Sequence, residues 1–211
     1  MSLTVLSSLA QRRGACALIP IKARACCKTR LAEVLSPSAR IELARAMLSS
    51  VLTAACNART VHQVVVISPE RDTLPPDIPV LADTGESLNG ALTQAQRVLH
   101  EFGCHEIVVL PADLPQINSA EIDTLVQAAR AGGFAIAPDA AGIGTNALGL
   151  ASRLPFRFQF GPDSHRLHLL EARRLGLSPS VIRLPGLELD VDSPADLERA
   201  EGQPWLTQLR A

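Results

Sequence analysis

The 211-residue sequence is poor in the features by which proteins bind nucleic acids. It has no tyrosine, aromatic residues make up only 3% of it, and its formal net charge is -1. A nucleic-acid-binding surface concentrates basic residues, and a surface for single strands also needs aromatic rings on which bases stack. We therefore expect no nucleic-acid partner.

Long apolar runs are also lacking. No run approaches the length that crosses a membrane, and the opening Met-Ser-Leu-Thr-Val-Leu lacks the positive charge of a secretory signal. We therefore expect no membrane partner.

The five cysteines, Cys16, Cys26, Cys27, Cys56 and Cys104, form no C-x-x-C pair and have no metal-type spacing with histidine. Their number is odd, and two of them are adjacent. The expectation is reduced thiols in a cytoplasmic protein. The oligomeric state is left open, and a homodimer is compatible with the sequence.

What the sequence does contain is a regular alternation of apolar runs and amphipathic segments. Runs rich in β-branched residues predict buried strands, and apolar residues three or four apart predict helices. Strands are expected at residues 15–21, 64–67, 80–82, 108–110, 135–137, 156–160 and 181–184. Helices are expected at residues 37–55, 88–101, 119–131 and 161–175, with another starting near 193.

This alternation predicts an α/β fold: a single three-layer α/β/α domain with a mostly parallel, Rossmann-like twisted sheet over residues 14–211. Residues 1–13 are expected to be a flexible N-terminal extension. Two helix starts carry capping signals. Ser36 precedes Pro37, and Ser193 stands three residues before Asp196.

One acid stands out at the end of a predicted strand. The run Val108-Val109-Leu110 stops at Pro111, and Asp113 follows with no charged neighbour. Ligands of open α/β sheets gather at the carboxyl ends of the strands, and carboxylates suit a divalent metal. The alternative reading of Asp113 is a turn or N-cap acid.

Asp190 and Asp192 are two residues apart on a predicted extended segment, so both side chains point to the same face. With Asp113 they could form an all-oxygen Mg²⁺ site. The alternative is a helix-entry turn, but Ser193 already supplies that cap, which leaves the two acids without a structural task.

A basic loop follows the first predicted strand and carries Lys22, Arg24, Lys28 and Arg30 within nine residues. Such a cluster suits a polyphosphate. It has neither the G-x-x-x-x-G-K-[ST] spacing nor the three glycines of a dinucleotide fingerprint. A solvated basic turn is the alternative reading.

A second anion-binding candidate is Phe160-Gly161-Pro162-Asp163-Ser164. With Gly at the N-cap and Pro in the first turn, the N–H groups of Asp163 and Ser164 would be free. The charge of Asp163 argues against this, and an ordinary helix start is the alternative. The five histidines do not converge, and His165 and His168, on one helix face, have no partner acid in the sequence.

Several motifs in a fixed order carry a family resemblance. They are Pro20-x-Lys22 with Lys28-Thr29-Arg30-Leu31, Asp83-x-Gly85 with Leu88-Asn89-x-Ala91-Leu92, Leu110-Pro111-Ala112-Asp113-Leu114-Pro115, Pro138-Asp139, Gly144-Thr145-Asn146-Ala147-Leu148, Phe160-Gly161-Pro162-x-Ser164 and Leu189-Asp190-Val191-Asp192-x-Pro194. From Ile19 to Leu197 the chain resembles the guanylyltransferases of coenzyme F-420 biosynthesis, relatives of the molybdopterin and sugar nucleotidyltransferases.

The resemblance implies a nucleotidyltransferase-type fold and transfer of GMP from GTP to a phosphorylated three-carbon acid, with release of pyrophosphate. The acid would be 2-phospho-L-lactate, phosphoenolpyruvate or 3-phospho-D-glycerate. By the same resemblance, Asp113, Asp190 and Asp192 are similar to Mg²⁺ ligands, and Thr145, Gly161 and Ser164 to the contacts of the acid. Lys22 and Lys28 match the triphosphate-binding lysines, and Ser68 and Asn89 fall near the nucleoside.

The sequence departs from the family pattern at two places. Glu86-Ser87 replaces a small residue before Leu88, and Ile143 stands where a polar residue is usual, which affects the choice of acceptor. Two other functions are considered: a nucleotidyltransferase for a pterin or sugar phosphate, and a nucleotide-binding regulator without turnover. The missing glycine-rich opening loop counts against the first, and the three acids count against the second.

Overall fold

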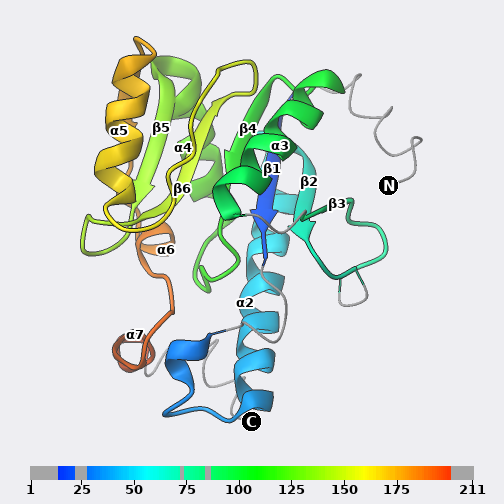
Figure 1. Ribbon diagram of the computed structural model, residues 1–211, viewed down its shortest axis with the longest axis vertical. Coiled ribbons are helices and arrows are strands. Elements are labelled where there is room, and N and C mark those ends of the chain that lie inside the picture. Colours follow the sequence, from blue (N-terminus) through cyan, green and yellow to red (C-terminus); the bar gives the residue numbers. More distant parts are fainter. Residues whose placement is uncertain (1–13, 22–27, 72–73, 84–86, 201–211) are drawn as a thin grey trace.

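The computed structural model describes residues 14–21, 28–71, 74–83 and 87–200, which contain one seven-stranded sheet (Figure 1). The strand order is β3-β2-β1-β4-β6-β5-β7. Strand β6 runs antiparallel to its neighbours β4 and β5, and every other pair is parallel. The strands are β1 (Ala15–Pro20), β2 (Val61–Ser68), β3 (Val80–Ala82), β4 (Glu106–Val109), β5 (Gly133–Pro138), β6 (Thr145–Ala151) and β7 (Ser178–Val181).

Helices cover both faces of this sheet. Helices α2 (Pro37–Asn57) and α4 (Ser119–Gly132) pack on one face, and α3 (Leu88–Glu101) and α5 (Ser164–Arg174) pack on the other. In Figure 1, α3 and α5 lie in front of the sheet. The predicted three-layer α/β fold with a mostly parallel sheet is thus confirmed. The short helices are η3 (Thr29–Leu31), α6 (Pro185–Glu188) and α7 (Pro194–Arg199).

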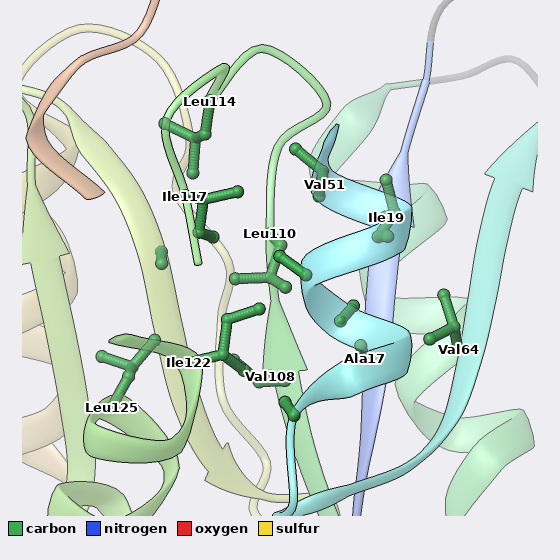
Figure 2. Close-up of a cluster of buried hydrophobic side chains, with 14 of the residues drawn as sticks. Ala17, Ile19, Val51, Val64, Val108, Leu110, Leu114, Ile117, Ile122 and Leu125 are labelled. Carbon is green, nitrogen blue, oxygen red and sulfur yellow. The ribbon is translucent and has the colours of Figure 1, made fainter. Parts of the chain in front are cut away.

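The central strands are buried on both faces, as a parallel sheet between two helical layers requires. Ala17 and Ile19 of β1 pack in one core cluster with Val51 of α2 (Figure 2). The alternate residues Cys16 and Leu18 belong to the cluster on the other face. Because side chains alternate along a strand, one run of apolar residues supplies both cores.

Capping residues begin α2 and α7 where the sequence predicts. The Ser36 hydroxyl accepts a hydrogen bond from the Ala39 N–H at 3.2 Å, and Pro37 is the first residue of α2. Ser193 and Asp196 form a capping box at the start of α7. Within the described ranges, no helix is both long enough and apolar enough to cross a membrane.

The strand predicted over residues 156–160 is wrong, although its alternation is real. Phe156 and Phe158 are 3% and 5% exposed, and the segment belongs to no strand. Three of its backbone N–H groups bind side chains instead of a neighbouring strand. Arg157 N donates to Glu171, Gln159 N to His168, and Phe160 N to Asn89. The alternation of apolar and polar residues therefore predicted correctly which side chains are buried, but not where the backbone finds its hydrogen-bond partners.

The last strand begins earlier than predicted. β7 covers Ser178–Val181 rather than residues 181–184. The chain still follows β5 for one more residue, because Ile182 N donates to Ile136 O at 2.8 Å. The strand has few apolar residues and lies at the edge of the sheet, so it lacks the buried run on which the prediction relied.

The expectation that all cysteines are reduced is also wrong. The structure joins Cys16 of β1 to Cys104, just before β4, in a disulfide with a Cα–Cα separation of 6.5 Å. The two residues are 88 positions apart, and only the pairing of β1 with β4 brings them together. Among the described cysteines, Cys56 is free and exposed.

The side chain of Asp123, on α4, forms hydrogen bonds to the turn between α2 and β2. Its carboxylate accepts hydrogen bonds from Thr60 N at 2.8 Å, Thr60 Oγ1 at 2.7 Å and Arg59 N at 3.3 Å. Burial acts to raise the pKa of Asp123, but these hydrogen bonds outweigh it and the pKa is lowered. The carboxylate therefore stays charged and holds the turn.

We predict that Asp123→Ala lowers the free energy of unfolding by about 1–3 kcal/mol, because the buried donors of Thr60 lose their acceptor. Urea denaturation followed by circular dichroism measures the change. Asp77→Ala is the control, since Asp77 is an exposed acid in the connection before β3. Equal effects of the two substitutions would contradict this role of Asp123.

Candidate active site

The carboxyl ends of β1 to β4 border a cavity of about 550 Å³. This volume lies within the range of small-molecule and cofactor sites, and ligands of open α/β sheets bind at this edge. The strand ends, the segment around η3 and the N-terminal half of α2 form its walls. Its polar lining includes Lys28, Arg30, Arg45, Ser68, Asp113 and Asp192.

Lys28 joins two of the predicted acids in this cavity. Its Nζ lies 2.7 Å from Asp113 Oδ2 and 2.7 Å from Asp192 Oδ1, and the lysine side chain is only 9% exposed. Burial acts to lower the pKa of Lys28, but the two carboxylates outweigh it and the pKa is raised. The ammonium therefore remains charged in a largely buried position between two anions.

Lys28 is held in place by the residues that follow it. It adopts a left-handed conformation with a φ of 48°, which is unfavourable for a residue other than glycine and persists where surrounding contacts hold it. Leu31 N donates to Lys28 O, and Leu31 is fully buried in a small cluster with Met47 of α2 and Val191. Asp192 follows Val191, so this cluster positions both ends of the ion pair.

Asp190 lies close to the same acids but makes no ion pair with Lys28. Burial, together with the charge of Asp113, raises the pKa of Asp190 to about 6, and a hydrogen bond from Asn146 at 3.3 Å acts in the opposite sense. Val191 N also donates to Asp113 O at 3.3 Å. These contacts bring the segments that carry the three predicted metal ligands to one place.

The three acids do not form a finished metal site. In residues 14–21, 28–71, 74–83 and 87–200, no group of three or more His, Cys, Asp or Glu side chains is arranged to hold a metal ion. Asp113 and Asp192 instead converge on the ammonium of Lys28. Their role as metal ligands therefore stays a prediction.

The predicted nucleotide-binding residues are placed unequally. Arg30 and Ser68 line the cavity with Lys28. The Ser68 hydroxyl is already engaged with its own loop, since it donates to Glu70 O at 2.6 Å and accepts from Glu70 N at 3.0 Å. Lys22 and Arg24 lie outside the described residues.

Asn89, predicted to lie near the nucleoside, has a different contact in the structure. Its Nδ2 donates to Phe160 O at 3.1 Å, and its Oδ1 accepts from Phe160 N at 2.8 Å. Both polar atoms of the side chain are thus used to hold the backbone just before Gly161. Contact of Asn89 with a nucleoside remains a prediction.

The predicted acceptor residues, which are the residues expected to contact the acid substrate, lie around the start of α5. Thr145 begins β6 and is 8% exposed, and Ser164 is the first residue of α5 and 2% exposed. The N-cap of α5 is Asp163, with a φ of 59°, and not Gly161 as predicted. Ser164 N donates to Gly161 O at 3.2 Å, so the predicted anion site of free N–H groups is not formed by Ser164.

The loop before Thr145 is closed by Asp139. Its carboxylate accepts hydrogen bonds from Ile143 N and Gly144 N, both at 2.9 Å. A Cβ at Gly144 would lie 2.6 Å from Asp139 Oδ2, so this close turn requires glycine. The Ile143 side chain, which departs from the family pattern, is 59% exposed on this loop.

His168 of α5 contacts Thr145, a predicted site residue, and this contact was not predicted from the sequence. His168 is fully buried, its Nδ1 lies 3.0 Å from Thr145 Oγ1, and its Nε2 accepts from Gln159 N at 2.8 Å. Burial, with a smaller contribution from His165, lowers the pKa of His168 to about 4. The sequence did carry a signal for this placement: His168 stands four residues after Ser164, so both lie on one face of the predicted helix.

Comparison with protein families identifies a match over nearly the whole chain. The family model described as "Guanylyl transferase CofC like" matches residues 15–200. The chain is 39% identical over 191 residues to a phosphoenolpyruvate guanylyltransferase of Chloroflexus aurantiacus, covering 86% of this chain and 92% of that one. It is 40% identical over 210 residues to a 2-phospho-L-lactate guanylyltransferase of Methanothermobacter thermautotrophicus, covering 92% and 91%.

Among solved structures, a proposed nucleotide-diphospho-sugar transferase from Desulfovibrio desulfuricans superposes with a TM-score of 0.74. The two chains are 19% identical, and the alignment covers 90% of this chain and 89% of the other. This likeness independently supports the fold.

His168 gives the stability of the fold a pH dependence. In the unfolded chain the ring takes up a proton near its ordinary pKa of 6.5, whereas the buried ring does so only near 4. Between these values the unfolded chain binds more protons. The contribution of His168 is therefore fully present above pH 6.5 and is lost as the pH falls towards 4. His165 and Glu171 are the other titratable groups acting on the ring.

We predict that lowering the pH from 7 to 5 reduces the free energy of unfolding by about 2 kcal/mol through protonation of His168 in the unfolded chain. Urea denaturation at both pH values gives the change in the free energy of unfolding for the wild-type protein and for His168→Asn. The difference between these two changes is the contribution of His168. His105→Asn, which changes an exposed histidine, is the control. The same pH dependence in the wild type and His168→Asn would contradict the prediction.

Proposed function

Because this chain belongs to the guanylyl transferase CofC-like family, we propose that it transfers GMP from GTP to a small phosphorylated three-carbon acid and releases pyrophosphate. The acceptors in the names of its relatives are phosphoenolpyruvate and 2-phospho-L-lactate. With 3-phospho-D-glycerate, which the sequence motifs also imply, they are the three candidate acids. The proposed place of the reaction is coenzyme F-420 biosynthesis, in the cytoplasm.

The observation that carries this proposal is a pair of carboxylates and a lysine ammonium gathered in the cavity at the carboxyl ends of β1 to β4. Lys28, Asp113 and Asp192 come from three distant segments and meet within hydrogen-bonding distance. Each of them lies within the region matched by the family. The relatives are similar over the whole of this region and not over a single motif.

The chemistry needs charge neutralisation and alignment rather than a general base. The acceptor phosphate is already an anionic nucleophile at neutral pH. One of its oxygens attacks the α-phosphorus of GTP, and the bond from that phosphorus to the bridging oxygen breaks as pyrophosphate leaves. Lys28 and Arg30 supply positive charge beside the phosphates, and Thr145 and Ser164 supply hydroxyls for the acid.

We also propose that the reaction uses Mg²⁺ held by Asp113, Asp190 and Asp192. The donor set fits this ion, because all three side chains offer hard carboxylate oxygens and two of them already share one cation, the Lys28 ammonium. When bound, the ion would stabilise negative charge on the phosphate oxygens. Lys28 would then be available to contact the phosphates.

We predict that Asp113→Asn lowers the rate of pyrophosphate release at least about 100-fold, because the proposed Mg²⁺ site loses one of its three carboxylate ligands and Lys28 loses one of its two ion-pair partners. A coupled pyrophosphate assay with GTP, Mg²⁺ and each of the three acids measures the rate. Asp77→Asn, an exposed acid outside the cavity, is the control and should retain the wild-type rate. Circular dichroism verifies that both variants are folded.

The same assay decides the proposed function. Release from the wild-type protein with one acid, abolished by EDTA and restored by Mg²⁺, is the expected result. Failure of the wild-type protein to release pyrophosphate with any of the three acids would overturn the assignment.

A further inference from the structure

We infer that His168 is a positioning residue of the acceptor site, which donates a hydrogen bond to Thr145 and so leaves the Thr145 hydroxyl proton for the acid substrate. This inference rests on the proposed function, since it concerns the residue that would contact the acid. His168 is fully buried and contacts the Thr145 hydroxyl. It therefore acts through the threonine rather than on the substrate.

The contacts of His168 fix which ring nitrogen carries the proton. A backbone N–H can only donate, and Gln159 N lies 2.8 Å from Nε2, so Nε2 must be the acceptor. A neutral imidazole carries one N–H, which is then at Nδ1. Nδ1 lies 3.0 Å from Thr145 Oγ1, so the ring donates and the hydroxyl accepts.

This direction determines what Thr145 can do. A hydroxyl has one proton and two lone pairs. If the Thr145 hydroxyl instead donated its proton to His168, it could only accept further hydrogen bonds. It would then present lone pairs to an anionic substrate and could not bind it. With the ring donating, one lone pair is satisfied and the proton remains for a carboxylate or phosphate oxygen. In the described part of the chain, His168 is the single hydrogen-bond partner of Thr145 Oγ1.

Aromatic rings hold the imidazole in this orientation. Phe160 packs edge-on against it with ring centroids 4.9 Å apart, and Phe156 stacks at 5.8 Å. Because burial lowers its pKa to about 4, the ring is neutral at pH 7. A buried polar ring is costly unless its nitrogens are hydrogen-bonded, and both nitrogens of His168 are satisfied.

The arrangement joins the three predicted acceptor residues into one unit. Ser164 lies one helical turn before His168 on α5, and residues four apart share a helix face. Gln159, which fixes the tautomer, lies two residues before Gly161. A shift of the His168 ring would therefore change the hydroxyl of Thr145 and the loop at Gly161 together.

Two substitutions of His168 separate its two hydrogen bonds. The amide nitrogen of Asn lies near the position of Nδ1, so His168→Asn can still donate to Thr145 but loses the acceptor for Gln159. The amide oxygen of Gln lies near Nε2, so His168→Gln keeps the acceptor for Gln159 but loses the donor to Thr145. Both remove the ring, so a purely structural role predicts similar effects.

We predict that His168→Gln raises the KM for the acid about tenfold, whereas His168→Asn raises it less than about threefold. The KM for GTP should stay at the wild-type value in both. Leu169→Ala is the control, because Leu169 packs against the core from α5 and makes no hydrogen bond to Thr145. It should lower stability without changing the KM for the acid.

A double-mutant cycle with Thr145→Val tests whether the two residues act as one. Thr145→Val alone should raise the KM for the acid at least about tenfold, and adding His168→Gln should raise it no further. Additive effects would overturn the inference. So would a wild-type KM for the acid in His168→Gln.

Failure of the proposed function gives a different result. If the wild-type protein releases no pyrophosphate with any acid, the proposed function and this inference both fall. If the wild type is active and the KM of His168→Gln is unchanged, only the inference falls.

The tautomer itself can be measured without a variant. The ¹⁵N spectrum of the wild-type protein, assigned for His168, should show a protonated Nδ1 and an unprotonated Nε2 at pH 7. A protonated Nε2 would overturn the inference even if the His168 variants fail to fold.

Discussion

The ammonium of Lys28 between Asp113 and Asp192 is the contact on which the arrangement of the cavity at the sheet edge depends. It joins Lys28 to Asp113, which is 85 residues away in the chain, and to Asp192, which is 164 residues away. The largely buried Lys28 ammonium would be costly to bury alone, and the two carboxylates offset much of that cost. The contact is possible because Leu31 and Val191 pack in one small cluster against α2. A separate minor core thus positions charges that the main core does not reach.

A second part of the site is built on the other half of the sheet. Where β6 runs antiparallel to β4, its first residue, Thr145, lies at the same edge as the ends of the parallel strands. Asn146 connects this strand to the acids, since its amide donates to Leu187 O, Glu188 O and Asp190. One reversed strand therefore places Thr145 at the same sheet edge as the charged cavity, as a transfer between two bound substrates requires.

The fold was predictable wherever local signals agree with burial. Ser36 and Pro37 mark the start of α2, and the apolar runs mark the central strands. Residues 156–160 were mispredicted because alternating exposure does not show where the backbone finds its hydrogen-bond partners. The disulfide of Cys16 with Cys104 depends on strand order, which spacing along the chain does not reveal. In the site, Lys28 and the acids were predictable from residue type, whereas His168 required the contact between β6 and α5.

The irregular segment at residues 156–160 has an evolutionary consequence. In a strand, backbone pairing is independent of side-chain identity, and substitutions leave the hydrogen bonds intact. Here the N–H groups depend on the identities of Asn89, His168 and Glu171, which lie on two helices. Selection for the shape of this loop therefore acts on helix residues outside the loop. A lineage could change the acid it accepts by substitutions in α3 or α5, without altering any residue that touches the substrate.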